Sequence, residues 1–301
     1  MLTIDPKSIP TGDLHQYLLG TVAPRPIAFV STISEDGTPN LAPYSFFNAF
    51  SSNPPVLVFS SNRRVANNTT KDTLANVQAN GEVVINAVSY NIVRQMTVTS
   101  VEFDQSISEF EKAGLTPLPS DLVKPFRVKE SPAHLECKVK EIITLGHHGG
   151  AGHLVICEVL RMHIDENVIE NGRINPHKMD LMGRMGRAYY VRASGDAIHT
   201  IVQSVMDITI GYDHLPASVR NSTVLTGNNI GQLAGITQAP EAAAVQQCID
   251  EDPILQQVLA EKGTLADLHE QIRTVLEDDR KREYAAQLAW AGEQLVQNGQ
   301  L

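Results

Sequence analysis

Short apolar runs rich in β-branched and aromatic residues recur through the first two thirds of the chain, each bounded by Gly, Pro, Asn or Asp. This pattern is typical of β-strands. The runs occupy residues 26–34, 54–61, 82–89, 134–143, 153–164 and 188–193. Asp36-Gly37 predicts a tight reversal after the first strand, and Asn171-Gly172 predicts a second hairpin. The glycine-rich link at residues 146–152 joins two long strands, which we expect to pair antiparallel.

Helical signals are sparser in the same region. Residues 71–81 have apolar residues at helical spacing and end on a glycine, a typical C-terminal stop. Residues 89–100 and 106–114 also predict short helices, and the second opens with Ser106 followed three residues later by Glu109, the capping-box pattern. Many short strands with inserted helices favour a barrel over a doubly wound parallel sheet.

The pattern changes in the last third of the chain. Residues 205–240 are rich in turns and allow no firm assignment. Further on, apolar residues recur at three- and four-residue steps and predict three helices. These begin at Asp252-Pro253, at Thr264 and near residue 280, the first with an N-cap followed by proline at the first helical position.

Charge divides the chain in a similar way. Residues 239–301 hold 5 basic and 12 acidic residues, a net charge of −7, whereas the whole chain carries −10. We expect a strand-rich domain at residues 1–195 followed by a mostly helical C-terminal extension at residues 196–301. The acidic balance argues against nonspecific binding to nucleic acid, which requires clustered Lys and Arg.

Three further features limit the class of protein. No run of about 20 apolar residues predicts a membrane span. The N-terminus lacks a basic region followed by an apolar run, so we expect no secretory signal. Three cysteines without C-x-x-C spacing suggest neither a disulfide framework nor a zinc site. We expect a cytoplasmic protein that does not associate with membranes.

Residue types that could bind a phosphorylated aromatic ligand concentrate in residues 20–61 and 71–88. Hydroxyls and cations suit a phosphate, and flat apolar side chains suit an aromatic ring. The candidates are the hydroxyls of Ser31, Thr32, Ser45, Ser51, Ser60 and Ser61, the cations Arg25, Arg63, Arg64 and Lys71, and the rings of Tyr44, Phe46 and Phe47. Lys71-Asp72-Thr73 also stands at a predicted helix start, where free N–H groups favour an anion. On residue types alone, an ordinary core with polar turns remains the simpler alternative.

Several short segments, five of them in order and two later ones, together point to a known family. They are Pro24–Ala28, Gly37–Asn48, Pro54-Pro55 before a strand ending in Ser60, Lys71–Thr73 and Gly81–Asn86, then His153–Val159 and Arg184–Tyr189. In this order they resemble the flavin reductase-like family with the FMN-binding split barrel, over about residues 10–195. The resemblance implies a fold that is mainly β with some α: an antiparallel split β-barrel, followed here by the helical extension.

The resemblance implies that FMN binds noncovalently, commonly at the interface of a homodimer, and that the substrate is a small molecule. It implies that the run Ala42–Asn48 lines the isoalloxazine ring, with contacts from Tyr44, Ser45, Phe46, Phe47 and Asn48. In the resemblance, the phosphate is held by Ser60, Ser61, Lys71 and Thr73. Two residues of the first strand make further contacts with the cofactor, Arg25 and Thr32. Arg184 would either reach the same site or support closure of the barrel.

On this resemblance NAD(P)H is the co-substrate, and hydride passes to the flavin and on to a small acceptor such as free flavin, ferric iron, a quinone or a nitro compound. Hydride transfer requires no acid–base side chain, so we expect no catalytic residue beyond the cofactor site. No G-x-G-x-x-G motif follows a strand, so no Rossmann unit is predicted. Many family members carry Gly-Asp-His before a later strand, where this chain has residues 146–153. His148, His153 or neither would face the nicotinamide.

Two other functions stay open. The protein could bind flavin without turnover, as an electron carrier, or it could be a structural or interaction domain that has lost its cofactor. A metal site is suggested by four histidines, His147, His148, His153 and His163. They lack a carboxylate or cysteine partner at fixed spacing, so we expect no bound metal ion. We expect the C-terminal helices to pack on the barrel or on a second subunit, with their acidic faces in water.

Overall fold

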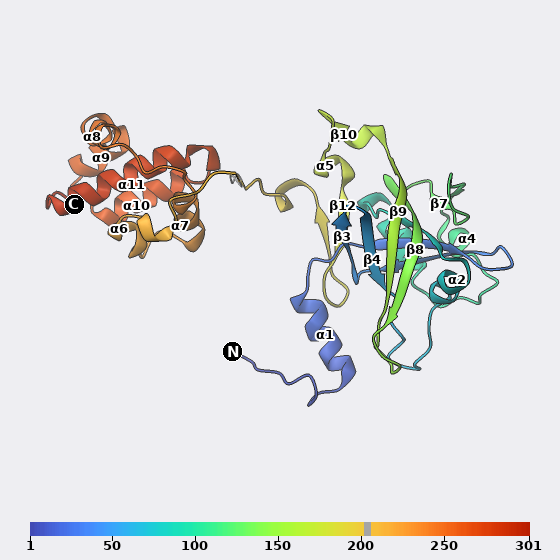
Figure 1. Ribbon diagram of the computed structural model, residues 1–301. Helices are drawn as coiled ribbons and strands as arrows, with labels where there is room; N and C mark the ends of the chain where they lie inside the picture. The colour runs from blue at the N-terminus through green and yellow to red at the C-terminus, as the bar shows by residue number, and fades with distance from the viewer. Residues whose placement is uncertain (202–205) are drawn as a thin grey trace. The chain divides into compact units, whose positions relative to one another are not determined.

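The chain forms two compact units, Met1–Ile198 and His199–Leu301, in a computed structural model that describes residues 1–201 and 206–301. The first unit contains a large β-sheet, and the second holds only helices among its described residues (Figure 1).

A seven-stranded antiparallel sheet, in the order β2-β1-β5-β8-β9-β4-β3, is the frame of the first unit. Its strands are β1 (Ala28–Ile33), β2 (Pro39–Tyr44), β3 (Phe47–Ser52), β4 (Pro55–Ser60), β5 (Glu82–Asn86), β8 (Ala133–Thr144) and β9 (His153–Ile164). β2 and β3 lie at opposite edges of the sheet although only Ser45 and Phe46 separate them in sequence. The three Cα steps from one strand to the other span at most about 11 Å, so the sheet must curl until its edges approach at this corner.

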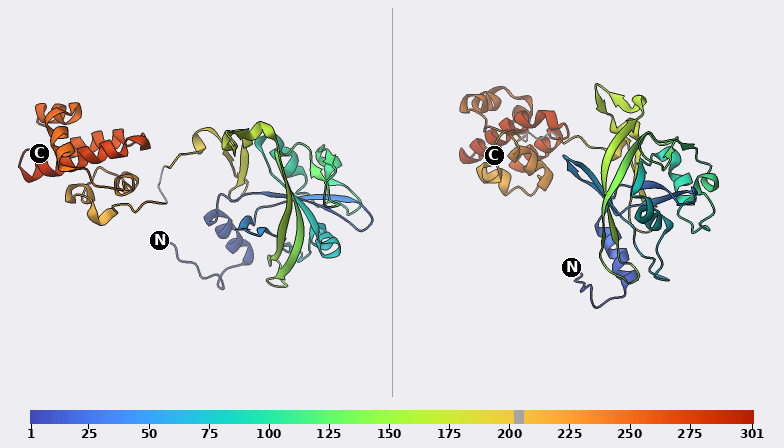
Figure 2. Two further views of the ribbon diagram at one scale, coloured as in Figure 1. Left: turned by 45° about the horizontal axis from the view of Figure 1, so that its top comes forward. Right: turned by 45° about the vertical axis from the view of Figure 1, so that its right-hand side comes forward.

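The curled sheet, visible in both views of Figure 2, is a barrel that stays open between its edge strands. This confirms the predicted fold class, mainly β with α in an antiparallel split barrel, with helices following it. β8 and β9 pair antiparallel across the glycine-rich link, as expected. Asn171 and Gly172, both at positive φ (51° and 73°), form the predicted turn between β10 (Ile169–Glu170) and β11 (Arg173–Ile174).

The central strands are buried on both faces. In β1, Ala28 and Val30 belong to the barrel interior, and Phe29 belongs to a second apolar cluster on the outer face. α2 (Asp72–Asn80) contributes Leu74 and Val77 to the interior, whereas α3 (Val93–Val98) and α4 (Glu109–Ala113) cover the outer cluster. The start of α2 is thereby fixed against β1 and β2.

Short elements surround this frame. They are α1 (Thr11–Thr21), β6 (Pro117–Leu118) paired with β7 (Arg127–Val128), α5 (Pro176–Met179), β12 (Leu181–Arg184) paired with β13 (Tyr190–Ala193), and the 3₁₀ turns η1 (Tyr90–Ile92), η2 (Glu166–Val168) and η3 (Gly195–Ala197). The capping box predicted at Ser106 is wrong. Its hydroxyl donates to Asp104 Oδ1 at 2.6 Å, and α4 begins later, after an N-cap at Ser108 that makes no side-chain hydrogen bond.

The second unit is a cluster of helices around its own apolar core. Its elements are η4 (Tyr212–His214), α6 (Ala217–Arg220), α7 (Gly227–Ala234), α8 (Ala242–Glu251), α9 (Pro253–Ala260), α10 (Leu265–Val275), η5 (Asp279–Lys281) and α11 (Arg282–Gln297). Asp252 caps α9, and Thr264 with Asp267 forms a capping box on α10, so the predicted helix starts are confirmed. α6 and α7 fall in the segment 205–240, of which residue 205 lies outside the described residues. Along the described ranges, no helix has both the length and the apolarity to cross a membrane.

Candidate functional site

The end of β2, the end of β4 and the start of α2 lie against one another. Tyr44 is the last residue of β2, and its ring centroid lies 5.1 Å from that of Phe59 in β4. Lys71, the N-cap of α2, places Nζ 4.9 Å from the centroid of the Tyr44 ring. Thr73 Oγ1, in the first turn of α2, accepts a hydrogen bond from Asn40 Nδ2 in β2 at 3.1 Å. Two predicted phosphate contacts therefore lie beside a predicted ring contact.

Two buried hydroxyls next to this junction have unused hydrogen-bonding capacity. Tyr44 is 5% exposed and Ser61 is 1% exposed, and neither hydroxyl makes a hydrogen bond of good geometry within the described part of the chain, although both belong to one group of hydroxyls with Thr73. Burial raises the pKa of Tyr44 to about 12, although the nearby Thr73 and Ser61 hydroxyls oppose the rise. The phenol therefore keeps its proton at neutral pH and can donate to a ligand.

Lys71 is a cation that keeps its donors free. Its ammonium makes no hydrogen bond or ion pair with any described residue. Burial lowers the pKa of Lys71, and the charge of Arg64 lowers it further. The two neighbouring arginines differ in this respect: Arg64 pairs with Glu102 at 3.1 Å, and Arg63 donates twice to Asn68 at 2.7 Å. Lys71 thus remains available to an anion at the helix start.

Buried amides hold α2 in place. Asn76 of α2 donates through Nδ2 to Thr32 Oγ1 of β1 at 3.0 Å, so the predicted cofactor contact Thr32 serves here to dock the helix. Neither Asn76 nor Asn40 was identified from residue types, because each acts on a partner far along the chain. The N-terminus of α2 has no side-chain cap, so its first N–H groups can face an anion.

Arg25 is committed to structural contacts. Its guanidinium makes four hydrogen bonds, to Ser45 Oγ and to the carbonyls of Leu19, Val22 and Met185. These bonds tie the end of α1 and the residue after β12 to the segment that precedes β1, and only 4% of Arg25 is exposed. Arg184 bridges Arg25 through paired backbone hydrogen bonds of 2.9 and 2.8 Å, and its guanidinium lies 4.5 Å from the Tyr190 ring centroid. The backbone bonds join the segment before β1 to β12, while the choice between the two roles predicted for Arg184 stays a prediction.

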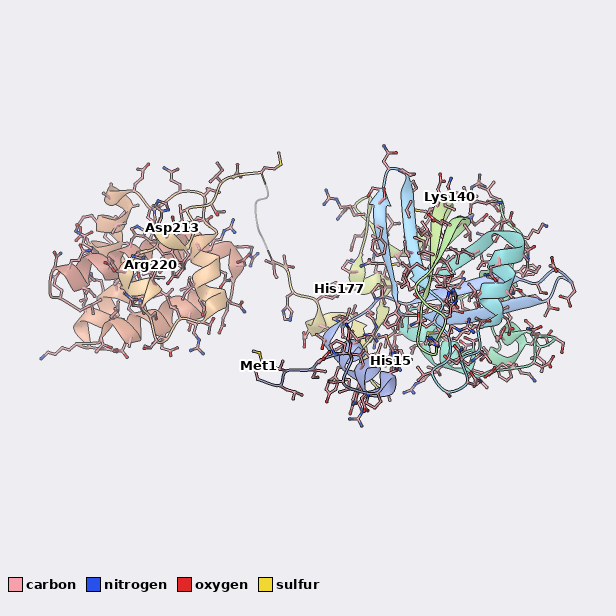
Figure 3. The ribbon with its side chains drawn as sticks, turned by 60° about the horizontal axis from the view of Figure 1, so that its bottom comes forward. Met1, His15, Lys140, His177, Asp213 and Arg220 are labelled. Carbon is pink, nitrogen blue, oxygen red and sulfur yellow. The ribbon has the colours of Figure 1, made fainter. Side chains whose placement is uncertain are left out.

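The rest of the predicted ring-binding run turns outward along β3. Phe46 lies in the corner between the edge strands, where its carbonyl accepts from Ser60 N at 2.8 Å. His15 of α1, labelled in Figure 3, meets the Phe46 ring edge-on at 6.2 Å. Phe47 is half-buried, and Asn48 is exposed. β3 pairs with β4 alone, so its second edge carries backbone donors and acceptors that a ring edge could use.

Ser60 and the segment that includes His153 are packed closely. Ser60 Oγ donates to Asn62 Oδ1 at 2.7 Å, and a Cβ on Gly152 would lie 2.5 Å from Ser60 Oγ. His153 is 5% exposed, its Nδ1 lies 3.1 Å from Thr144 Oγ1, and burial lowers its pKa. His148 is exposed in the glycine loop. The two candidates for the nicotinamide side thus differ: one is enclosed and one is open to solvent.

A separate cluster of possible metal ligands joins Asp121, Glu136 and His163. Glu136 Oε1 lies 2.7 Å from His163 Nε2, and the Glu136 carboxylate accepts the backbone N–H groups of Asp121 and Leu122 at 2.9 and 2.6 Å. Asp121 is held by Arg161 at 2.7 Å. These hydrogen bonds account for the cluster as an anchor for the chain between β6 and β7.

The junction at Tyr44, Ser61, Lys71 and Thr73 fits one end of the cofactor named above. Two neighbouring hydroxyls without a hydrogen bond of good geometry, an ammonium without an ion pair among the described residues and an uncapped helix N-terminus are donors of the kind that a phosphate monoester accepts from. The adjoining corner at Phe46 offers aromatic surface and an open strand edge. Nothing in this donor set suits an apolar ligand or a metal ion.

Comparison with known proteins identifies the family. The family model for the flavin reductase like domain matches residues 20–189. An uncharacterized protein of Aquifex aeolicus is 42% identical over 184 residues, which cover 61% of this chain and 91% of that protein.

Two crystal structures resemble the first unit. Nitrilotriacetate monooxygenase component B from Bacillus cereus superimposes with a TM-score of 0.62 at 32% identity, over 66% of this chain and 98% of that chain. The 2-nitrobenzoate 2-nitroreductase NbaA of Pseudomonas fluorescens gives a TM-score of 0.60 at 27% identity, over 69% and 99% of the two chains. Through residues 20–189, the chain belongs to the flavin reductase like domain family.

Proposed function

We propose that the protein is an FMN-dependent oxidoreductase that uses NAD(P)H and delivers electrons to a small acceptor. The flavin-binding domain would be residues 1–195, and residues 196–301 would form a separate helical extension. The observation that carries the proposal is the free donor set at Tyr44, Ser61 and Lys71 beside the start of α2. The similar crystal structures, a monooxygenase component and a nitroreductase, support a redox role.

In this proposal the flavin supplies the hydride chemistry, and the chain's own residues bind and orient it. Lys71 and Thr73, with the N–H groups of the α2 start, hold the phosphate. Tyr44 and Ser61 donate hydrogen bonds from their hydroxyls to the phosphate or to the ribityl chain. The backbone of Ser45–Asn48 borders the ring, and the Phe46 side chain keeps water away from one side of it.

A second copy of the chain is part of the proposal. β3 exposes most of its residues, including Phe50 at 68%, and it is an unpaired edge of the sheet. An open edge with an exposed aromatic side chain is a surface that proteins usually cover. We therefore place the partner of a homodimer against β3, next to the ring-binding corner. Sedimentation equilibrium of the wild type and a Phe50→Asp variant tests this assembly. A cytoplasmic location remains an expectation from the sequence.

Visible spectroscopy tests the function. We expect the purified protein to bind FMN, to be yellow with it, and to lose its colour under nitrogen when NADH or NADPH is added. A yellow protein that neither nicotinamide reduces is a flavin-binding carrier instead. A protein that takes up no added FMN is instead a structural or interaction domain that no longer binds the cofactor.

Substitution at the phosphate contacts tests the assignment of residues. A Lys71→Ala, Thr73→Ala double variant removes two charge-assisted contacts worth roughly 1.5–3 kcal/mol each. We expect the Kd for FMN to rise about a hundredfold or more. Lys129→Ala, which removes an exposed lysine of the same unit, should leave the Kd unchanged. Equal affinity in the double variant and the control would remove the phosphate assignment.

A further inference from the structure

Helix α1 runs from the glycine loop to the turn between β12 and β13, beside the ring-binding corner. At its start, Cγ2 of Thr11 would lie 3.0 Å from a Cβ on Gly150 in that loop. At its end, Cα of Gly20 would lie 3.3 Å from a Cβ on Gly186 in the turn. Between the two ends, the ring of His15 faces the corner. The helix therefore borders the place where the proposed function puts the flavin ring.

His15 is the polar member of the stripe with which α1 meets the barrel. None of the residues of this helix is buried, and three are half-buried, Leu14, His15 and Leu19. Steps of one and four residues place these three side chains on one face of the helix. The other two are apolar, so an oxygen of a ligand at this face of α1 finds its hydrogen-bond donor on His15.

The His15 ring has a donor that a ligand can reach. Its imidazole meets the Phe46 ring edge-on, with 6.2 Å between the centroids and 75° between the planes. Neither ring nitrogen makes a hydrogen bond with a described residue, and neither is among the side-chain atoms that are closed off from solvent without a partner. A neutral imidazole carries one N–H. His15 can therefore donate a hydrogen bond to a molecule that lies against Phe46.

The charges around the corner limit what that molecule can be. Arg25 places Cζ 6.0 Å from the centroid of the Phe46 ring. Burial lowers the pKa of Arg25, and the nearby charge of Arg184 lowers it further. The acidic residue of α1, Asp13, is exposed and lies about 200° around the helix from His15. This positive surrounding disfavours a free metal cation, whereas an aromatic wall with one free N–H suits a flat ring that carries an oxygen.

We propose that His15 orients the electron acceptor at the ring-binding corner, by donating its N–H to a carbonyl or nitro oxygen of a flat aromatic molecule. The inference rests on the proposed function, because it takes the flavin ring to lie at the same corner. Among the acceptors considered above, a quinone, a nitro compound or a free flavin has such an oxygen, and ferric iron does not. His15 is thus a positioning residue for the acceptor.

Binding of duroquinone to the oxidised protein in excess FMN tests this contact without turnover, because no nicotinamide is present to supply electrons. His15→Leu keeps an apolar side chain beside Phe46 but removes the N–H. We expect it to raise the Kd for duroquinone about tenfold in calorimetry, as the loss of one hydrogen bond predicts. His15→Gln returns an N–H donor and should recover most of the affinity. Gln16→Leu, a change at the exposed next residue, should leave the Kd unchanged.

The carbonyl stretch of bound duroquinone reports the hydrogen bond itself. We expect infrared difference spectra of the wild type to show one carbonyl band at lower frequency, and His15→Leu to return that band to the position of a free carbonyl. A wild type that binds no FMN would refute the proposed function. A wild type that binds FMN, together with an unshifted carbonyl band or with equal duroquinone affinity in His15→Leu, overturns this inference alone. If His15→Leu does not fold, the wild-type band decides by itself.

Discussion

Acid should destabilise the first unit through His134. This residue of β8 is 7% exposed, and its Nδ1 lies 2.9 Å from Asn86 Oδ1. The same oxygen accepts Val128 N at 2.9 Å, and Asn86 Nδ2 donates to Phe29 O at 2.9 Å. The amide orientation is thus fixed, so His134 donates from Nδ1 to an oxygen. A second proton on the ring would enter a buried site beside Arg127, whose charge repels it.

The size of the effect follows from the pKa of His134. Burial lowers it to about 4, and the charges of Arg127 and His163 act in the same direction, while Glu136 opposes them. Between pH 6.5 and about 4, the unfolded chain holds a proton that the folded chain does not. Stability therefore falls as the pH falls through this window, by about 3 kcal/mol in total. Above pH 6.5 the contribution is constant.

A His134→Asn variant isolates this proton. Its side-chain N–H can still donate to Asn86, but it cannot titrate. Between pH 7.5 and pH 4 we expect the wild type to lose about 3 kcal/mol more than the variant in urea unfolding followed by far-UV circular dichroism of the sheet. Fluorescence of Trp290, the single tryptophan and a residue of the other unit, provides an internal control. Equal pH dependence in the two proteins would refute the reasoning.

Three further substitutions test contacts in the first unit. Glu136→Gln replaces the fully buried carboxylate that anchors the chain before β7 by a neutral amide, and should lower the free energy of unfolding at pH 7 by about 2 kcal/mol, measured with urea. Because the folded protein holds the pKa of Glu136 below its ordinary value of 4.5, the stability difference between wild type and variant should shrink as the pH falls below that value. Gly152→Ala sets a Cβ 2.5 Å from Ser60 Oγ and should cost about 1–3 kcal/mol in the same assay, whereas an unchanged midpoint would show that the strand end can shift freely. Arg25→Lys cannot reproduce four hydrogen bonds, so chymotrypsin should cleave α1 at Tyr17 faster than in the wild type, and an equal rate would show that Arg25 does not hold α1.

The strands that the sequence predicts well are those whose residues are buried. Runs of Val, Ile, Leu and Phe mark the strands that contribute side chains to the barrel interior, which include β4, β5, β8 and β9. β3 has almost no buried residue, so no apolar alternation marks it. Its existence follows instead from its pairing with β4, a contact that no local pattern encodes.

The candidate site divides in the same way between local and long-range information. Lys71 and Thr73 can be identified because a helix start is a local signal with a known preference for anions. Asn40 and Asn76 could not be, because they act on Thr73 and Thr32, which are 33 and 44 residues away. That all of these residues bind the cofactor stays a prediction, although the structure brings Tyr44, Lys71 and Thr73 into contact.

Arg25 and Lys71 show which property separates a ligand-binding cation from a structural one. Both are cations beside the same predicted cofactor site, and Arg25 is the more buried of the two. Residue type and burial would therefore rank Arg25 first. Its guanidinium, however, already makes four hydrogen bonds, whereas the Lys71 ammonium makes none with any described residue. Since the donors of a bound anion must be ones that the protein has not already used, unsatisfied hydrogen-bonding capacity selects Lys71 over Arg25.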